Sequence, residues 1–275
     1  MKYLILLLIV ISCGDDKLKK VEELDGFRII GITSTTPEVA PGTNGVALKV
    51  YVSDTKGGGR VIDGTVEACI DPGISFGASV GCSHDPTKVS GVYSINTASD
   101  LDLGAANLFT GLATDTFLAN VPLFIFNGRS TREQNNGVAY IVIFRFNVDG
   151  RVHESFKRII ATTRAIKNVN PVINSVNLNG VAVVSTKPRK GEKFLLDANA
   201  PETYSYVEVD DTQVSRSEAL KVAWFVSQGK FDKAKSDAGE EVEFTEDPPG
   251  DVMLLLSVLR DDRGGISIQR KILNN

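Results

Sequence analysis

The chain has 275 residues, of which 42% are hydrophobic and 23% are charged, and its formal net charge is −4. These values are typical of a soluble globular protein with sizeable cores, and they argue against a disordered chain. The slightly acidic balance argues against a nucleic-acid binder, which normally carries a basic excess. Three cysteines and two histidines are too few for a disulfide-dense miniprotein or a multi-ligand zinc module.

The amino-terminal segment has the pattern of an export signal. Lys2 supplies a positive start, and residues 3–11 form an apolar run about half as long as the ~20 residues of a transmembrane helix. A short apolar run behind a positive start predicts a secretory signal peptide, here residues 1–12.

The end of that run, Val10-Ile11-Ser12-Cys13-Gly14, resembles the lipobox of bacterial lipoproteins. The resemblance implies a diacylglyceryl thioether on Cys13, cleavage before Cys13 and acylation of the new amino terminus. Two or three acyl chains hold a protein at a membrane where one chain holds it only marginally. The alternative is an ordinary signal peptide with a chance cysteine.

The residues after Cys13 bear on the destination. By the same resemblance, Gly14 in place of an inner-membrane retention aspartate implies an outer-membrane lipoprotein of the cell envelope. Asp15 and Asp16 leave open an acidic surface-export signal, so the protein could face the periplasm or the exterior. Residues 13–26 are polar and of mixed charge, and we expect them to form a solvated tether.

Cys69 and Cys82 remain once Cys13 is assigned to lipid. The envelope outside the inner membrane is oxidising, so we expect these two cysteines to form a disulfide. A closed loop of about 14 residues would contribute roughly 3 kcal/mol to stability. Two free thiols are the alternative; a zinc site with nearby His84 matches no known ligand spacing.

Short β-branched or aromatic runs bounded by turn residues dominate the rest of the chain. Alternation places Val46, Leu48, Val50 and Val52 on one face of a strand, whereas residues 138–148 are apolar on both faces, as in a central strand. The first series of predicted strands comprises residues 27–33, 46–52, 61–70, 122–126, 138–148 and 152–162.

A second series of strands is predicted beyond Asn170-Pro171. Val222, Trp224 and Val226 share one face of its third member. The series comprises residues 171–178, 194–197, 220–226, 241–245, 252–259 and 266–273. We expect one short helical turn, starting at Ser215 or Ser217.

The two series align with each other in the same order. The paired segments are 36–54 with 185–199, 65–73 with 221–229, and 142–160 with 254–272. We interpret this as a duplication of one β unit, although two unrelated sandwiches could align as well. The predicted domains are residues 27–166, with an insert between Gly73 and Val121, and residues 167–275.

The predicted fold class is therefore all-β, with two tandem antiparallel β-sandwiches after the signal peptide and tether. The second unit resembles the immunoglobulin-like domains of bacterial envelope proteins, including polycystic-kidney-disease and cadherin-like types. Trp224 before a glycine turn and the Arg260-to-Gly265 turn carry that resemblance. The resemblance implies an immunoglobulin-like sandwich and no particular ligand.

The chain shows no recognisable catalytic or cofactor motif. Neither His84 nor His153 sits in a nucleophile–base pattern, and we expect both at the surface. Gly57-Gly58-Gly59 lacks the lysine and helix of a phosphate loop and is interpreted as a hairpin turn. No catalytic residue, cofactor or metal ligand is assigned.

A calcium site at the acidic turns Asp210-Asp211 and Asp261-Asp262 is a weak hypothesis. Their carboxylates are hard oxygen ligands of the kind that calcium prefers. However, no EF-hand spacing is present, and aspartates commonly occupy turns because they bond local backbone amides.

Two stretches are candidate recognition surfaces. The polar loop 127–137 carries Arg129 and Arg132 near its tip, and residues 99–117 hold irregularly spaced apolar side chains. We interpret the second stretch as core, with an exposed docking patch as the alternative.

The prediction for function is a lipid-anchored, non-enzymatic binding, adhesion or structural protein of the envelope. The expected partners are the membrane, through the anchor, and an unidentified envelope protein or polysaccharide, but no nucleic acid. The alternative is an envelope carbohydrate or peptidoglycan hydrolase that uses paired carboxylates.

Overall fold

The computed structural model describes residues 23, 24, 26–55, 59–73, 80–83, 85–97 and 112–274. Cys13, nearly all of the predicted tether, His84, two of the three consecutive glycines and residues 99–111 lie outside the described residues. Within the described part, no helix is long and apolar enough to cross a membrane.

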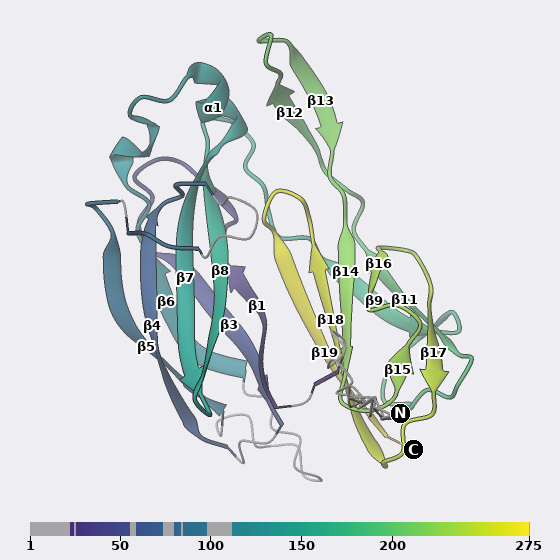
Figure 1. The fold of residues 1–275 in the computed structure, drawn as a ribbon. Helices are drawn as coiled ribbons and strands as arrows, with labels where there is room; N and C mark the ends of the chain where they lie inside the picture. The colour runs from purple at the N-terminus through teal and green to yellow at the C-terminus, as the bar shows by residue number, and fades with distance from the viewer. Residues whose placement is uncertain are drawn as a thin grey trace, which may run out of the picture.

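The first sandwich consists of two sheets (Figure 1). One sheet has three strands, in the order β1 (Phe27–Ser34), β3 (Val46–Asp54) and β6 (Leu112–Ala119). The other has five, in the order β2 (Glu38–Val39), β8 (Arg151–Ala161), β7 (Val138–Val148), β4 (Val61–Ile70) and β5 (Val89–Asn96). All pairings are antiparallel except the short one between β2 and β8.

The second sandwich is built in the same way. Its first sheet has the order β10 (Val181–Ala182), β9 (Ile173–Leu178), β11 (Lys193–Ala198), β17 (Val242–Glu246) and β15 (Lys230–Phe231). Its second sheet has the order β16 (Lys235–Asp237), β14 (Lys221–Val226), β18 (Val252–Arg260) and β19 (Ile266–Asn274). A separate hairpin, β12 (Thr203–Val207) with β13 (Gln213–Ser217), projects beyond these sheets.

Seven strands of each sandwich have equivalent neighbours. The order β1-β3-β6 corresponds to β9-β11-β17, and β8-β7-β4-β5 corresponds to β19-β18-β14-β16. The segments that the sequence aligns, including the hairpins β7–β8 and β18–β19, fall on these equivalent strands. The prediction of two tandem antiparallel sandwiches is therefore confirmed, and the structure shows that the two share one strand order.

Each sandwich has its own core. In the first, the predicted inward residues of β3 are at most 2% exposed and pack with Phe144 and Phe146 of β7. In the second, Trp224 is fully buried among Phe194, Phe231 and Phe244, and its indole N–H donates to Ser236 Oγ at 3.0 Å. Burial of apolar area in these cores is the main stabilising contribution.

Two local predictions are wrong. Residues 122–126 were expected to form a strand, but Leu123–Phe126 form a 3-10 helix of which only Ile125 is buried. The helical turn predicted at Ser215 or Ser217 is the strand β13, because this segment pairs with β12. The helix α1 (Thr131–Asn136) instead lies in the polar loop, where Ser130 and Glu133 form a capping box.

The insert predicted after Gly73 contains two strands of the sandwich itself, β5 and β6. Cys69 of β4 and Cys82 form the predicted disulfide. Both cysteines are buried with Ile141 and Ile143 on the outer face of the β4–β7 pair. The disulfide thus ties the loop to a small apolar cluster outside the main core.

Another apolar cluster lies between the sandwiches. Ile30 of β1 packs there with Phe225, Leu256 and Ile266 of the second sandwich. A register irregularity between Ile29 and Gly31 turns Ile30 away from the first core. Gly31 permits the close approach, because a Cβ at this position would lie 3.0 Å from Ile266 Cδ1.

The end of the predicted tether joins this cluster. Leu24 is 5% exposed, and its backbone N–H donates to the carbonyl of Val226 at 3.0 Å. The expectation of a solvated segment up to residue 26 is therefore wrong at Leu24. An apolar side chain at this position is buried against the second sandwich rather than left in water.

Candidate functional site

Polar side chains are buried where the two sandwiches and the connecting segment meet. Glu38 comes from β2, Arg164 and Asn168 come from the connection after β8, and Arg263 comes from the β18–β19 turn. Each is at most 8% exposed. Buried charges persist when they are paired and hydrogen-bonded. These groups pair with one another, while Arg164 Nε and Asn168 Oδ1 are buried without a hydrogen-bond partner among the described residues.

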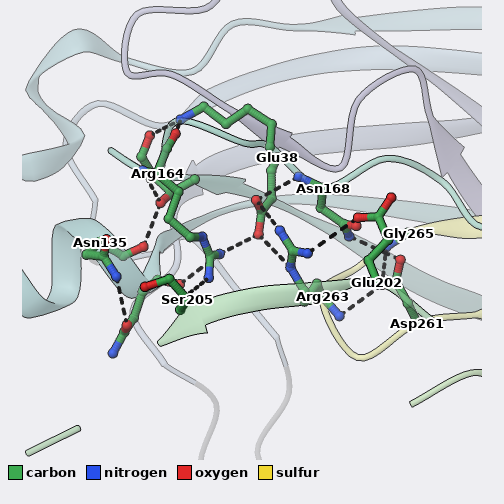
Figure 2. A network of polar contacts seen from close by, with 12 residues as sticks. Glu38, Asn135, Arg164, Asn168, Glu202, Ser205, Asp261, Arg263 and Gly265 are labelled. Atoms are coloured by element: carbon green, nitrogen blue, oxygen red, sulfur yellow. Dashed lines mark hydrogen bonds and ion pairs between the residues drawn. The ribbon is translucent and has the colours of Figure 1, made fainter. Parts of the chain in front are cut away.

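Glu38 is the centre of this network (Figure 2). Its Oε1 accepts from Arg164 Nη2 at 2.5 Å and from Arg263 Nε at 3.2 Å. Its Oε2 accepts from Arg263 Nη2 and from the backbone N–H of Asn168, both at 2.8 Å. One carboxylate therefore joins the first sandwich, the connection and the second sandwich through charge-assisted hydrogen bonds.

Arg263 continues the network toward two further carboxylates. Its Nη1 lies 3.1 Å from Glu218 Oε1 and 3.6 Å from Glu202 Oε2. Burial raises the pKa of Glu218 to about 7, and the neighbouring Asp261 acts in the same direction, whereas the Arg263 charge opposes the shift.

Aspartates of the two acidic turns accept hydrogen bonds from backbone N–H groups. Asp261 Oδ1 accepts from the N–H groups of Arg263 and Gly265, and its Oδ2 accepts from Asn168 Nδ2. Asp210 Oδ1 accepts from the N–H of Thr212. The contacts to backbone N–H groups are local turn contacts, whereas the one from Asn168 comes from the connecting segment. Among the described residues no group of three or more His, Cys, Asp or Glu side chains is arranged to hold a metal ion.

A crevice of about 430 Å³ opens beside this network, between β8 of the first sandwich and the β12–β13 hairpin of the second. Phe156, Arg158 and Ile160 line it from β8, and Tyr204 and Tyr206 line it from β12. Its volume lies within the range of small-molecule sites, and charged and polar side chains line it together with the aromatic ones.

Lys157 also lines the crevice and is only 7% exposed. Its Nζ donates to the carbonyl oxygen of Gly264, across the junction. Burial lowers the pKa of Lys157 to about 8, against the charge of Asp261, which favours the protonated form.

The predicted recognition loop contributes to the crevice through its end. Arg129 is paired with Glu133 at 3.2 Å, one turn along, and Arg132 lies in α1. The part of this loop that lines the crevice is Asn136 and Gly137. Asn136 forms two hydrogen bonds with the hairpin. Its Nδ2 donates to the Val207 carbonyl at 2.7 Å, and its Oδ1 accepts from the Val207 N–H at 2.8 Å.

Sequence reasoning missed the crevice residues Tyr204, Tyr206 and Lys157, and also Glu38 and Arg263. A usable signal for the hairpin was present, because Tyr204 and Tyr206 alternate with polar residues before a two-aspartate turn. The positions of Glu38 and Arg263 in a shared network depend on tertiary contacts between residues 225 positions apart.

His153 is half-buried rather than exposed as expected. Its ring meets Phe27 edge-on at 4.9 Å between centroids, and burial lowers its pKa. Phe27 begins β1, which packs beside β8, so an aromatic partner covers the imidazole.

No protein-family model matches the chain, and no curated protein matches it. Red sea bream transglutaminase is similar over 91% of this chain, with 8% identity and a TM-score of 0.28. Dimeric latent PorU from Porphyromonas gingivalis is similar over 90%, with 12% identity and a TM-score of 0.23. The chain spans 32% and 24% of the length of these two proteins.

Proposed function

We propose that this chain is a lipid-anchored, non-enzymatic binding module of the bacterial envelope, held at the outer membrane through Cys13. The crevice between β8 and the β12–β13 hairpin is its recognition site. The observation that carries the proposal is the position of this crevice relative to the tether.

Leu24, near the end of the predicted tether, and the crevice lie at opposite ends of the sandwiches. Leu24 bonds to Val226, the last residue of β14, whereas the β12–β13 hairpin precedes Lys221, the first residue of β14. In Figure 1 the hairpin and α1 lie at the top, and the end of β14 lies below. An anchor at Cys13 would therefore direct the crevice away from the membrane.

The pairing of the carboxylates at the junction supports a binding role over a role in glycoside hydrolysis. A glycosidase needs one carboxyl group that is free to donate a proton and a second that is free to act as nucleophile or base. At this junction Glu38 and Glu218 are both paired with Arg263, and Asp261 accepts local backbone N–H groups. These carboxylates are occupied in holding the sandwiches together.

The anchor is tested with Cys13→Ala in cells. We expect the wild-type chain in the membrane fraction after alkaline extraction and the variant in the soluble fraction, because the variant has no thiol for lipidation. A variant that stays in the extracted membranes would contradict the anchor.

The recognition site is tested by photocrosslinking in living cells, with p-benzoylphenylalanine in place of Tyr206. We expect a discrete adduct from position 206 and none from the control position Val181, which is 71% exposed on the distant strand β10. Equal labelling from both positions would contradict the crevice as the site. Release of soluble fragments from peptidoglycan by the purified chain would favour the hydrolase.

A further inference from the structure

The ammonium group of Lys157 has more N–H donors than the acceptors that surround it. An ammonium group carries three donors and an obligatory charge. The recorded acceptor is the Gly264 carbonyl, and no carboxylate of the described residues lies within ion-pair distance of Nζ. A buried cation in this state is costly, and an anionic group in the adjoining crevice would lower that cost.

The aromatic side chains of the crevice are held in place by arginines. The guanidinium of Arg158 lies 5.1 Å from the ring centre of Phe156, and that of Arg216 lies 3.6 Å from the ring centre of Tyr206. Cation–π contacts of this kind fix the ring orientation. A fixed ring offers a flat apolar surface, which complements the C–H face of a pyranose.

Three backbone groups of residues near the crevice are already engaged. The N–H and carbonyl of Val207 bond to Asn136, and the N–H of Ile160 bonds to Pro37. An extended peptide would need such groups to pair as an added strand. The crevice therefore suits a ligand recognised through ring faces and charge better than a peptide.

We propose that the crevice binds an acidic glycan, with a pyranose ring against Tyr206 and Phe156 and its carboxylate beside Lys157. This inference rests on the proposed function, because it names the ligand class of the same site. Arg158 also lines the crevice, where its Nε is paired with Asp71 Oδ2 at 2.5 Å.

The test is calorimetric titration of the full chain, purified in mild detergent, with two matched probes: a galacturonic acid trisaccharide and a galactose trisaccharide. We expect the acidic trisaccharide to bind at least about tenfold more tightly, as one charge-assisted contact provides. Lys157→Met should weaken binding of the acidic trisaccharide by about tenfold and leave binding of the neutral one unchanged.

Lys167→Met is the matched control, because Lys167 also donates to backbone carbonyls near the junction, those of Thr162 and Arg164, but does not line the crevice. We expect it to bind like the wild type. Tyr206→Ala alters a half-exposed side chain outside both cores and should weaken both trisaccharides, so the inference stays testable if Lys157→Met does not fold.

Equal affinity of the folded wild type for the two trisaccharides, or binding of neither, would overturn the glycan inference. Undiminished affinity of folded Lys157→Met or Tyr206→Ala for the acidic trisaccharide would also overturn it. The crosslinking result at position 206 decides the proposed function separately: an adduct to a protein would keep the recognition site and reject the glycan.

Discussion

A single buried carboxylate, Glu38, receives hydrogen bonds from Arg164, Arg263 and the backbone of Asn168. The sequence around it reads as an ordinary lead-in to a strand, and nothing local distinguishes it from the exposed glutamates. Its role follows from tertiary structure, because its partners lie 126, 225 and 130 positions away. Residue types and alternation predict strands well, but they do not predict which distant charges are buried together.

The first prediction concerns Glu38→Gln. This variant keeps the side-chain shape but leaves the buried Arg164 without its carboxylate and removes one of the carboxylates that pair with Arg263. We expect the free energy of unfolding in urea to fall by about 3 kcal/mol, the usual loss when one partner of a buried pair is removed.

Glu241→Gln is the matched control for that measurement. It removes one partner of the exposed Lys193–Glu241 pair, whose side chains are 51% and 55% exposed. We expect no measurable loss in urea, because exposed pairs are screened by solvent. If the two variants unfold at the same urea concentration, the central role of Glu38 is refuted.

At the scale of elements, prediction from the sequence succeeds for strands that carry a strong pattern. The expected ranges for β4 and β7 coincide with the observed strands, because long β-branched runs between turn residues have no competing structure. Prediction is wrong for residues 122–126, since a run this short carries no periodicity, and the helix α1 depends on its capping box rather than on hydrophobic pattern.

The second prediction concerns the contact between α1 and the hairpin. Asn136→Ala removes both hydrogen bonds to Val207, so the hairpin should open more often. We expect the amide hydrogen of Val207 to exchange with solvent at least about tenfold faster, measured by hydrogen–deuterium exchange.

The neighbouring Asn135→Ala is the control for that experiment. Asn135 Nδ2 donates to Asn136 Oδ1 at 3.4 Å, and Asn135→Ala leaves both hydrogen bonds between Asn136 and Val207 in place. We expect exchange at Val207 to stay within about twofold of the wild type. Unchanged exchange in Asn136→Ala would show that the hairpin is held by other contacts.

At the scale of the molecule, the two sandwiches pack as one body. The junction combines an apolar cluster around Ile30 and Phe225 with the buried network of Glu38. Domains joined by a small polar interface usually move relative to each other. Here the connecting segment itself is buried at Arg164 and Asn168, which bond to Glu38 of the first sandwich and Asp261 of the second.

The third prediction is the pH dependence of unfolding, which two junction groups control in opposite directions. Glu218 has a folded pKa of about 7 against an ordinary 4.5, so between these values the folded chain holds a proton that the unfolded chain has lost. Its contribution to stability is therefore present below pH 4.5 and is lost as the pH rises through 7.

Lys157 acts on the alkaline side. Its folded pKa of about 8 lies below the ordinary 10.5, so between these values the unfolded chain holds the extra proton. Stability from this group therefore rises between pH 8 and 10.5 and is lost as the pH falls through 8. Together the two groups place a minimum of stability between about pH 7 and 8.

Urea unfolding from pH 4 to 10.5 measures both effects when each variant is compared with the wild type. Relative to Glu218→Gln, the wild type should lose stability between pH 4.5 and 7, by at most about 1.4 kcal/mol per pH unit. Relative to Lys157→Met, it should gain stability between pH 8 and 10.5. The comparison removes the background of other carboxylates and lysines, which titrate in both chains. A wild-type slope that persists in Glu218→Gln would mean that Glu218 is ionised across this range and that Arg263 outweighs its burial.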